Sequence, residues 1–182
     1  MKDERSKTAR GDFWHRLRAT VFLLPALFAP HARLRVIFHR LRGVDIGRHV
    51  EIGYGCYVGG VYPFNVHIED NVTVAGPSAI LDHDNAHHYT FGGDVVCGEV
   101  RIREGSFIGI GSVVYPGVTI GPRAIVGALS FVKSDVPPEC IVAGQPATVR
   151  RFVNLPSSSQ GKPKTWRGSV CPARQRNGNP PG

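Results

Sequence analysis

The sequence predicts an all-β fold, a parallel β-helix wound from short strands, and two regularities of the chain support this prediction. Aliphatic residues return at every sixth position over a long stretch, and small or β-branched residues occupy a second fixed position of the same repeat. Glycine is frequent, with 22 residues, which suits a fold made largely of turns. The 182 residues provide one domain and its terminal segments.

The six-residue repeat starts at Ile46 and keeps its phase from Val96 onward. Its first position is held by Val96, Ile102, Ile108, Val114, Ile120, Val126 and Val132, and its fifth by Val100, Ser106, Ser112, Val118, Ala124, Ser130 and Val136. A half-buried strand alternates with period two and an amphipathic helix with a period of about 3.6, so neither keeps this phase. Glycine in nearly every repeat also disfavours a helix.

Each repeat is expected to form one side of a triangular coil, with the branched side chain inward and the small residue at the corner. Three sides complete a coil of 18 residues. The next coil stacks about 4.8 Å away, at the spacing of paired strands. This geometry predicts ladders of stacked side chains: Val96 with Val114 and Val132, Ile102 with Ile120, and Ile108 with Val126.

Two breaks in the repeat predict loops that leave the coil. Val58 and Ile68 are ten residues apart instead of twelve, and Ile80 and Val96 are sixteen apart. The second break contains Asp82-His83-Asp84 and, further on, His87-His88. Because loops on a rigid scaffold commonly carry binding and catalytic groups, this segment is the first candidate for a site.

The composition divides the chain into a basic helical segment at 1–43, the β-helix at 44–152 and a tail at 153–182 that is expected to be disordered. Two short helices are expected, around Trp14–Phe28 and Ala32–Leu41. Their aliphatic face either packs on the first coil or rests on a membrane surface. The apolar run at 19–30 is too short to span a bilayer, which takes about 20 residues.

Charge is distributed unevenly along the chain. Residues 1–48 carry eleven Lys/Arg and four acidic residues, 49–149 carry four and ten, and 150–182 carry seven and none. A nucleic-acid-binding domain normally gathers basic residues on its folded surface, so no nucleic-acid partner is expected. The basic ends fit an anionic membrane surface or phosphate groups of a ligand; alternatively they are solvated and without function.

The cysteines, at positions 56, 97, 140 and 171, are far apart and form no CxxC pair. Two lie inside predicted coils, where a free cysteine acts as a small apolar residue. We therefore expect a reduced chain without a structural disulfide, located in the cytoplasm and alternatively peripheral at the inner face of the membrane.

Several motifs between residues 44 and 152 carry a family resemblance. They are Ile68-Glu-Asp-Asn-Val-Thr-Val, Ile80-Leu-Asp-His-Asp, Phe107-Ile-Gly-Ile-Gly-Ser, Pro116-Gly-Val-Thr-Ile-Gly, Val136-Pro-Pro and Val142-Ala-Gly-Gln-Pro-Ala. With them the chain resembles the hexapeptide-repeat acyltransferases, in particular sugar and polysaccharide O-acetyltransferases of the maltose and galactoside acetyltransferase type. The resemblance implies a left-handed β-helix, a homotrimer, acetyl-CoA as acyl donor between adjacent prisms, and a sugar or glycan acceptor.

His83 aligns with the catalytic histidine of that family. Acyl transfer to a hydroxyl needs a base near neutral pH, and imidazole fits this need. Asp82 and Asp84 flank His83, and either carboxylate could fix its tautomer and stabilise the imidazolium, unless both point away. The sequence has no phosphate-binding loop, dinucleotide fingerprint or serine nucleophile elbow, so direct transfer without an acyl-enzyme is expected.

The resemblance also assigns binding residues. Asn65, by the resemblance, and His88, in the same loop as His83, are candidates for the acceptor, although a structural role in a turn or loop is an alternative for each. His87 and His88 also remain as competing bases. Candidates for CoA are Gly109, Gly111, Gly127, Ala128, Lys133 and Arg151. The small residues would let the pantetheine arm approach the backbone, while the cations would meet phosphates. Lys133 is displaced by one position from the lysine of many relatives.

Two alternatives remain from other functional classes. A γ-type carbonic anhydrase uses the same prism with three histidines on zinc, and His83 and His88 have a spacing suited to two ligands. The third histidine has no evident candidate, so no metal is expected. A non-catalytic scaffold is the other alternative. Bound zinc would support the first, and failure to bind CoA the second.

Overall fold

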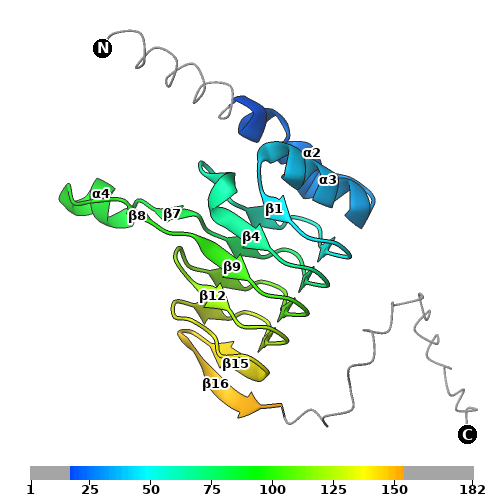
Figure 1. Cartoon of the computed structure of the whole chain (residues 1–182). Coiled ribbons are helices and arrows are strands. Elements are labelled where there is room, and N and C mark those ends of the chain that lie inside the picture. The colour runs from blue at the N-terminus through cyan, green and yellow to red at the C-terminus, as the bar shows by residue number, and fades with distance from the viewer. Residues whose placement is uncertain (1–16, 154–182) are drawn as a thin grey trace, which may run out of the picture.

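The computed structural model describes residues 17–153, which form a triangular parallel β-helix closed at one end by helices (Figure 1). Residues 14–16 of the first expected helix and the expected disordered tail from residue 154 onward lie outside the described residues. Residues 17–21 are helical, and the further helices are α2 (Leu23–Phe28), α3 (Ala32–Arg42), the 3₁₀ turn η1 (Pro63–Asn65) and α4 (Ala86–Phe91). None of the helices in this range has the length and apolar character needed to cross a bilayer.

Three sheets form the faces of the prism. Face A contains β1 (Asp45–Ile46), β4 (Val66–Ile68), β9 (Val100–Ile102) and β12 (Thr119–Ile120). Face B contains β2 (Glu51–Ile52), β5 (Thr73–Val74), β10 (Phe107–Ile108), β13 (Ile125–Val126), β15 (Cys140–Gly144) and the antiparallel β16 (Ala147–Phe152). Face C contains β3 (Tyr57–Val58), β6 (Ala79–Ile80), β11 (Val113–Val114) and β14 (Phe131–Val132). A separate pair is formed by β7 (His83–Asp84) and β8 (Val96–Cys97).

The stacking of equivalent side chains is confirmed for most of the predicted ladders. Ile102 pairs in register with Ile120, and Ile108 with Val126. The predicted place of Val96 is wrong: it pairs with Asp84 in β7–β8 and is 41% exposed. Ile80 stands beside Val114 in its place. The chain leaves the prism between Ile80 and Val96. The six-residue phase read from the sequence therefore no longer matches the pairing of the coils at Val96.

Small residues at the fifth position of the repeat are buried at the corners, as predicted. Their serines satisfy backbone carbonyl groups that point into the narrow interior. Ser106 Oγ donates to Gly121 O at 2.8 Å, and Ser112 Oγ donates to Gly127 O at 3.0 Å. A buried hydroxyl is stable only when hydrogen-bonded, so these contacts explain why serine alternates there with valine and alanine.

The helical cap packs on the first coil through a largely polar face, so the expectation of an aliphatic contact is wrong for α3. Its buried residues are Arg35, Val36, His39 and Arg42, whereas Leu34, Ile37 and Leu41 are exposed. Neighbouring coils exchange backbone hydrogen bonds, as Gly53 N donates to Val74 O at 2.8 Å and Asn71 N to Arg48 O at 2.9 Å. The carbonyl groups on the outer edge of the first coil have no preceding coil to pair with, and unpaired buried groups are costly.

Three arginines of α3 supply the missing donors, one for each face of the first coil. Arg40 Nε donates to Ile46 O at 3.2 Å, and Arg35 Nε to Ile52 O at 2.8 Å. Arg42 donates to Val58 O at 2.8 Å. The cap thus takes the place of a preceding coil, and this requirement, rather than apolar packing, determines the buried face of α3.

His39 lies within this group of arginines and is fully buried. Burial, and after it the positive charges of the nearby Arg42 and Arg35, lower the pKa of its imidazole to about 3. Its Nδ1 lies 3.2 Å from the Arg42 guanidinium, which donates to it. His39 is therefore neutral at physiological pH.

We predict that His39→Gln weakens the pH dependence of stability. Between the ordinary histidine pKa of 6.5 and the folded value of about 3, the unfolded chain binds one proton more than the folded chain. Wild-type stability should therefore fall with decreasing pH by up to about 1.4 kcal/mol per pH unit across this window. Urea unfolding at pH 7, 6 and 5 measures the slope, and the exposed His31→Gln should leave it unchanged. An unchanged slope in His39→Gln would contradict this assignment.

Candidate active site

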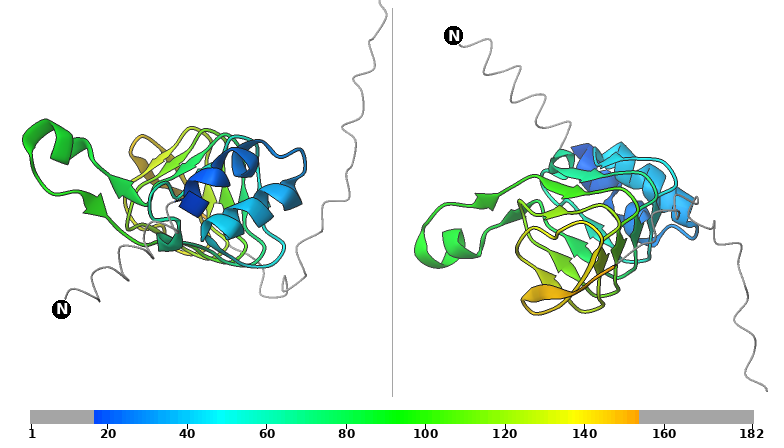
Figure 2. Two further views of the ribbon diagram at one scale, coloured as in Figure 1. Left: turned by 90° about the horizontal axis from the view of Figure 1, so that it is seen from above. Right: turned by 60° about the horizontal axis from the view of Figure 1, so that its bottom comes forward.

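The predicted catalytic segment lies where the chain leaves the prism between faces C and A, here called the C–A corner. After β6 the chain runs outward through β7, turns at α4 and returns through β8 before β9 begins. Figures 1 and 2 show residues 82–97 projecting from the side of the prism as an arm. Because β7 and β8 pair only with each other, the base of the arm presents its side chains at the surface.

His83 and Asp82 form a directed pair at the base of this arm. His83 Nδ1 lies 2.7 Å from Asp82 Oδ1. The Asp82 side chain is 1% exposed and the His83 side chain 16% exposed. A carboxylate at Nδ1 fixes that nitrogen as the donor and leaves Nε2 as the acceptor. The partly exposed ring thus has the tautomer that a general base requires.

Asp82 is itself held by the backbone of the preceding coil. Its Oδ1 also accepts the N–H of Gly60 at 3.0 Å, and its Oδ2 accepts the N–H of Tyr62. Burial opposes ionisation of the carboxyl group, but these two N–H donors and His83 outweigh it, so the pKa of Asp82 lies below its ordinary value. Asp82 is therefore an anion fixed in the wall of the prism.

Asp84 has a different role from Asp82. Its Oδ1 accepts the N–H of Ala86 at 2.8 Å, and its Oδ2 accepts the hydroxyl of Tyr115 at 2.7 Å. The Ala86 N–H and then the Tyr115 hydroxyl hold the pKa of Asp84 below its ordinary value. Asp84 thus fastens the arm to the next coil and does not contact His83 through a hydrogen bond.

Three residues at this corner were not predicted from the sequence. The Tyr62 ring meets the His83 ring edge-on, with centroids 6.1 Å apart, and Tyr115 binds Asp84. Cys97 stands opposite His83 in the β7–β8 pair and is exposed. The ladder register would have located Tyr115, because it follows Val114 and Val114 lies beside Ile80.

The two predicted acceptor residues lie at different places. Asn65 ends η1, three residues after Tyr62, and its backbone N–H donates to Tyr62 O at 2.9 Å. His88 lies on the exposed α4 of the arm, where its Nδ1 is 2.8 Å from Gly93 O. Asn65 is thus connected to the loop that binds Asp82, whereas His88 stabilises the turn of the arm.

Most predicted CoA residues lie at another edge of the prism, between faces B and C, here called the B–C corner. Gly109 and Gly111 follow β10, while Gly127 and Ala128 follow β13. A Cβ atom on Gly109 would lie 2.5 Å from Ala128 N, so coil stacking itself requires glycine there. Beside this corner, Gly55, Tyr57, Pro77, Ser78, Ala79, Gly111, Ser112 and Val113 line a shallow groove of about 240 Å³.

The two predicted cations do not lie together. Lys133 is exposed below the C–A corner, with Nζ 5.9 Å from the centre of the Tyr115 ring. Arg151 is exposed on β16, at the end of face B opposite the cap. Within one chain, the candidate CoA residues are therefore divided between two corners and the terminal hairpin.

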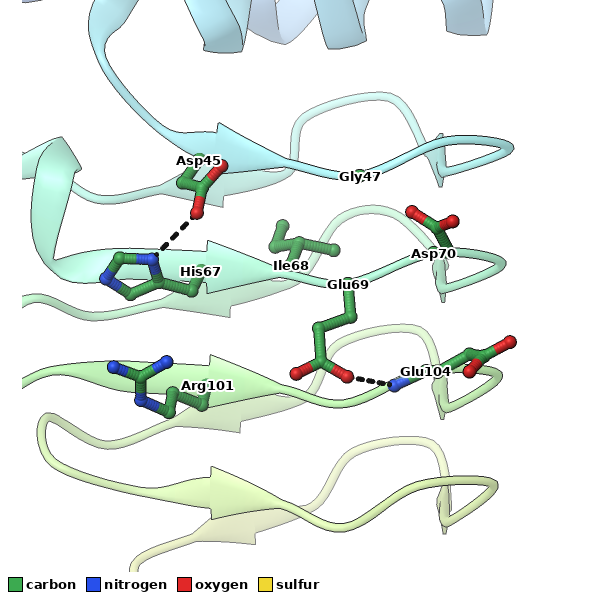
Figure 3. Close-up of a pocket in the computed structure, with 8 residues that line it drawn as sticks. All are labelled: Asp45, Gly47, His67, Ile68, Glu69, Asp70, Arg101 and Glu104. Carbon is green, nitrogen blue, oxygen red and sulfur yellow. Dashed lines mark hydrogen bonds and ion pairs between the residues drawn. The ribbon is translucent and has the colours of Figure 1, made fainter.

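A larger hollow of about 380 Å³ lies on face A, away from His83 (Figure 3). Its charged side chains are already paired: His67 lies between Asp45 at 3.0 Å and Glu99 at 2.7 Å, and Glu69 binds Arg103 at 2.8 Å. None of residues 82–97 lines this hollow. It is therefore a salt-bridged outer surface and not part of the candidate active site.

The described residues bring no three His, Cys, Asp or Glu side chains together as a metal site. His83 and His88 each have Nδ1 engaged in a contact within the chain. The pattern of partners at the C–A corner is that of an oriented base beside a buried carboxylate, which is suited to taking a proton from a hydroxyl group.

Comparison with known proteins agrees with this fold and motif pattern. The family model described as "Bacterial transferase hexapeptide (six repeats)" matches residues 99–134. Nodulation protein L of Rhizobium meliloti is 37% identical over 144 residues, covering 75% of this chain and 74% of that protein. The chain belongs to the hexapeptide-repeat acyltransferase family.

Other relatives carry acetyltransferase names. The galactoside O-acetyltransferase of Escherichia coli is 33% identical over 122 residues, covering 65% of this chain and 59% of that protein. The galactoside O-acetyltransferase of Lactococcus lactis is 30% identical over 118 residues, covering 59% of this chain and 55% of that protein. The chain thus spans a little over half the length of these curated relatives.

Solved structures confirm the left-handed parallel β-helix predicted from the sequence. A maltose O-acetyltransferase from Clostridium difficile aligns with a TM-score of 0.62 and 20% identity, covering 79% of this chain and 89% of that one. A galactoside acetyltransferase in complex with coenzyme A aligns with a TM-score of 0.56 and 22% identity, covering 79% and 83%.

We predict that Asp82→Asn destabilises the protein by roughly 1–3 kcal/mol at pH 7, because an amide cannot accept all three N–H donors. The lowered pKa of Asp82 contributes stability above the ordinary aspartate pKa of 3.8 and loses it as pH falls through the folded value. The difference from wild type should therefore shrink in acid. The more exposed Asp84→Asn should cost less in urea unfolding. Equal, pH-independent losses in both variants would refute this role for Asp82.

Proposed function

We propose that this protein transfers an acetyl group from acetyl-CoA to a hydroxyl group of a sugar or glycan acceptor, with His83 as general base. The observation that carries the proposal is the Asp82–His83 pair, in which a buried anion orients a partly exposed imidazole at the foot of an arm. The names of the galactoside O-acetyltransferases among its relatives support the reaction class.

In the proposed reaction, His83 Nε2 takes the proton of the acceptor hydroxyl as its oxygen attacks the thioester carbonyl carbon. The carbon–sulfur bond then breaks, and the imidazolium returns the proton to the departing CoA thiolate. Asp82 stabilises the imidazolium and keeps Nδ1 as a donor throughout, as carboxylates do in other histidine-dependent acyl transfers. The acetyl group passes directly to the acceptor, so no acyl-enzyme forms.

Asp84, Asn65 and His88 complete the proposed arrangement. Asp84 holds the arm through Tyr115 and thereby positions His83, which follows from its two hydrogen bonds. Asn65 is proposed to contact the acceptor from the loop that also binds Asp82. His88 would contact the acceptor only if the arm reaches over the acceptor. The exposure of His88 on α4 permits such a contact.

The division of the candidate CoA residues supports a homotrimer with shared sites. Gly111 and Tyr115 lie at opposite edges of face C, and four extended residues span about 13 Å. The B–C corner of one chain can face the C–A corner of its neighbour, which would bring the groove near Gly111 to His83. In this arrangement Gly109, Gly127 and Ala128 line the pantetheine path, and Lys133 and Arg151 approach the phosphates.

The first experiment is a calorimetric titration with acetyl-CoA, combined with an assay of bound zinc and of acetyl transfer to sugars. We expect CoA binding without zinc. Loss of CoA binding would sink the acyltransferase proposal and favour a scaffold, and stoichiometric zinc would favour the carbonic anhydrase alternative.

We predict that His83→Ala abolishes acetyl transfer, with a loss of at least about 10²-fold, while CoA affinity stays close to that of wild type. His87→Ala, the same change on the exposed part of the arm, should retain activity. Steady-state kinetics and the titration above separate the two effects. Full activity in His83→Ala would exclude it as the base.

We predict that a mixture of two inactive variants regains activity if sites are shared between chains. His83→Ala removes the base at the C–A corner, and Ala128→Trp places a bulky side chain on an exposed position of the B–C corner. Mixed trimers formed after unfolding and refolding the two together contain sites with both corners intact. Activity no greater than the sum of the separate variants would indicate that each site lies within one chain.

A further inference from the structure

The outer side of the cap is an exposed apolar surface without a partner in the described chain. Residues 17–28 and α3 present two stripes at helical spacing, and each member is at least 38% exposed. Together these residues form the cap surface: Leu17, Val21, Leu24, Phe28, Leu34, Ile37 and Leu41. Leu24 and Phe28 are 67% and 61% exposed. A contiguous exposed apolar patch, unlike a single exposed apolar residue, marks an interaction surface.

The two stripes lie on neighbouring helices, so they form one continuous surface. Phe22 and Phe38 stack between the helices with ring centroids 6.1 Å apart. Figure 2, in the view from above, shows α2 and α3 lying side by side across the end of the prism. The opposite side of α3 is occupied by the arginine contacts to the first coil, so its aliphatic stripe cannot turn inward.

Charge around the cap surface is of one sign. The exposed cations of this region are Arg18, Arg33 and Arg40, and residues 13–44 contain no Asp or Glu. Residues 49–149, which make up most of the prism, instead carry ten acidic and four basic residues. The cap is therefore an apolar and basic end of a mainly acidic prism, and Arg150 and Arg151 on β16 add positive charge at the other end.

We propose that the cap surface binds an anionic lipid membrane. Amphipathic helices that lie in a membrane interface combine exposed Leu, Ile and Phe with arginines and lysines at the edge, as this cap does. Anionic headgroups attract the basic cap and repel the acidic prism, and the cap adds exposed apolar side chains to its positive charge, so contact through the cap is favoured. A second copy is a poorer occupant, because a two-fold contact would bring the arginines of both caps together.

Membrane binding through this surface would hold the candidate active site close to the lipid headgroups. Arg42 of the cap donates a hydrogen bond to Gly59 O in the first coil. The N–H of the next residue, Gly60, donates to Asp82. His83 therefore lies about two coils, or roughly 10 Å, below the cap. This consequence rests on the proposed function, and it favours an acceptor sugar that is itself attached to a lipid.

The test is flotation of the full chain with large vesicles, which requires neither CoA nor an acceptor. We expect binding to vesicles of phosphatidylglycerol mixed with phosphatidylcholine, little binding to phosphatidylcholine alone, and release at high salt. The double variant Leu24→Glu/Phe28→Glu should reduce the partition coefficient at least about tenfold. A failure of catalysis would leave this result unchanged, so the two proposals fail independently.

The matched control is Val149→Glu/Phe152→Glu, which adds the same charge to two exposed apolar residues at the opposite end of the prism. It should bind vesicles far better than the cap variant, and circular dichroism checks that both are folded. Absence of binding to anionic vesicles, or equal loss in both variants, would overturn the proposal. Light scattering gives the mass of the wild type and of the cap variant. If the mass of the cap variant is half that of the wild type, the cap surface joins copies of the chain, and the proposal is overturned.

Discussion

The pairing of backbone groups between coils is the constraint on which the rest of the structure depends. Each coil exchanges hydrogen bonds with the coils on either side, as Gly53 N donates to Val74 O and Asn71 N to Arg48 O, so the first coil has one edge without a coil to pair with. A buried carbonyl group without a donor is costly, and a β-helix therefore needs a cap at this end. Here Arg40, Arg35 and Arg42 provide donors to the three sides in turn.

This solution has consequences at both surfaces of the cap. Because α3 uses its polar side to cover the first coil, its aliphatic side faces outward and becomes available to a lipid surface. On the inner side, Arg42 also binds Gly59 O, just before the loop whose N–H groups bind Asp82. The orientation of His83 thus depends on the same rigid coil that the cap completes.

The coiled part of the fold could be predicted because six-residue periodicity and strand pairing leave little freedom. Ile102, Ile108 and the corner serines take the places that the repeat requires. The place of Val96 could not be predicted, because Val96 stands six residues before Ile102 and so keeps the phase of the repeat although it belongs to the arm. The sequence did not indicate that arginines of α3 are buried, because the carbonyl groups that they bind belong to the first coil and are identified only in the folded structure.

At the candidate site, the sequence indicated the segment and left the roles of the carboxylates open. Asp82 and Asp84 are equivalent as neighbours of His83 in the sequence. They differ only in the coil that provides their hydrogen-bond partners. Asp82 meets N–H groups of the preceding coil, whereas Asp84 meets Tyr115 of the following one. The separation of the B–C and C–A corners likewise appears only when the coils are closed into a prism.

A crystal structure of the protein with bound CoA would show whether His83 and the groove near Gly111 form one site between two chains. We expect a trimer in which the CoA thiol lies at the C–A corner, within about 4 Å of His83 Nε2 or one water molecule away. The pantetheine arm should run beside the Gly111 groove of a neighbouring chain. A CoA thiol far from His83 would exclude His83 as the base, and CoA held wholly within one chain would exclude a shared site.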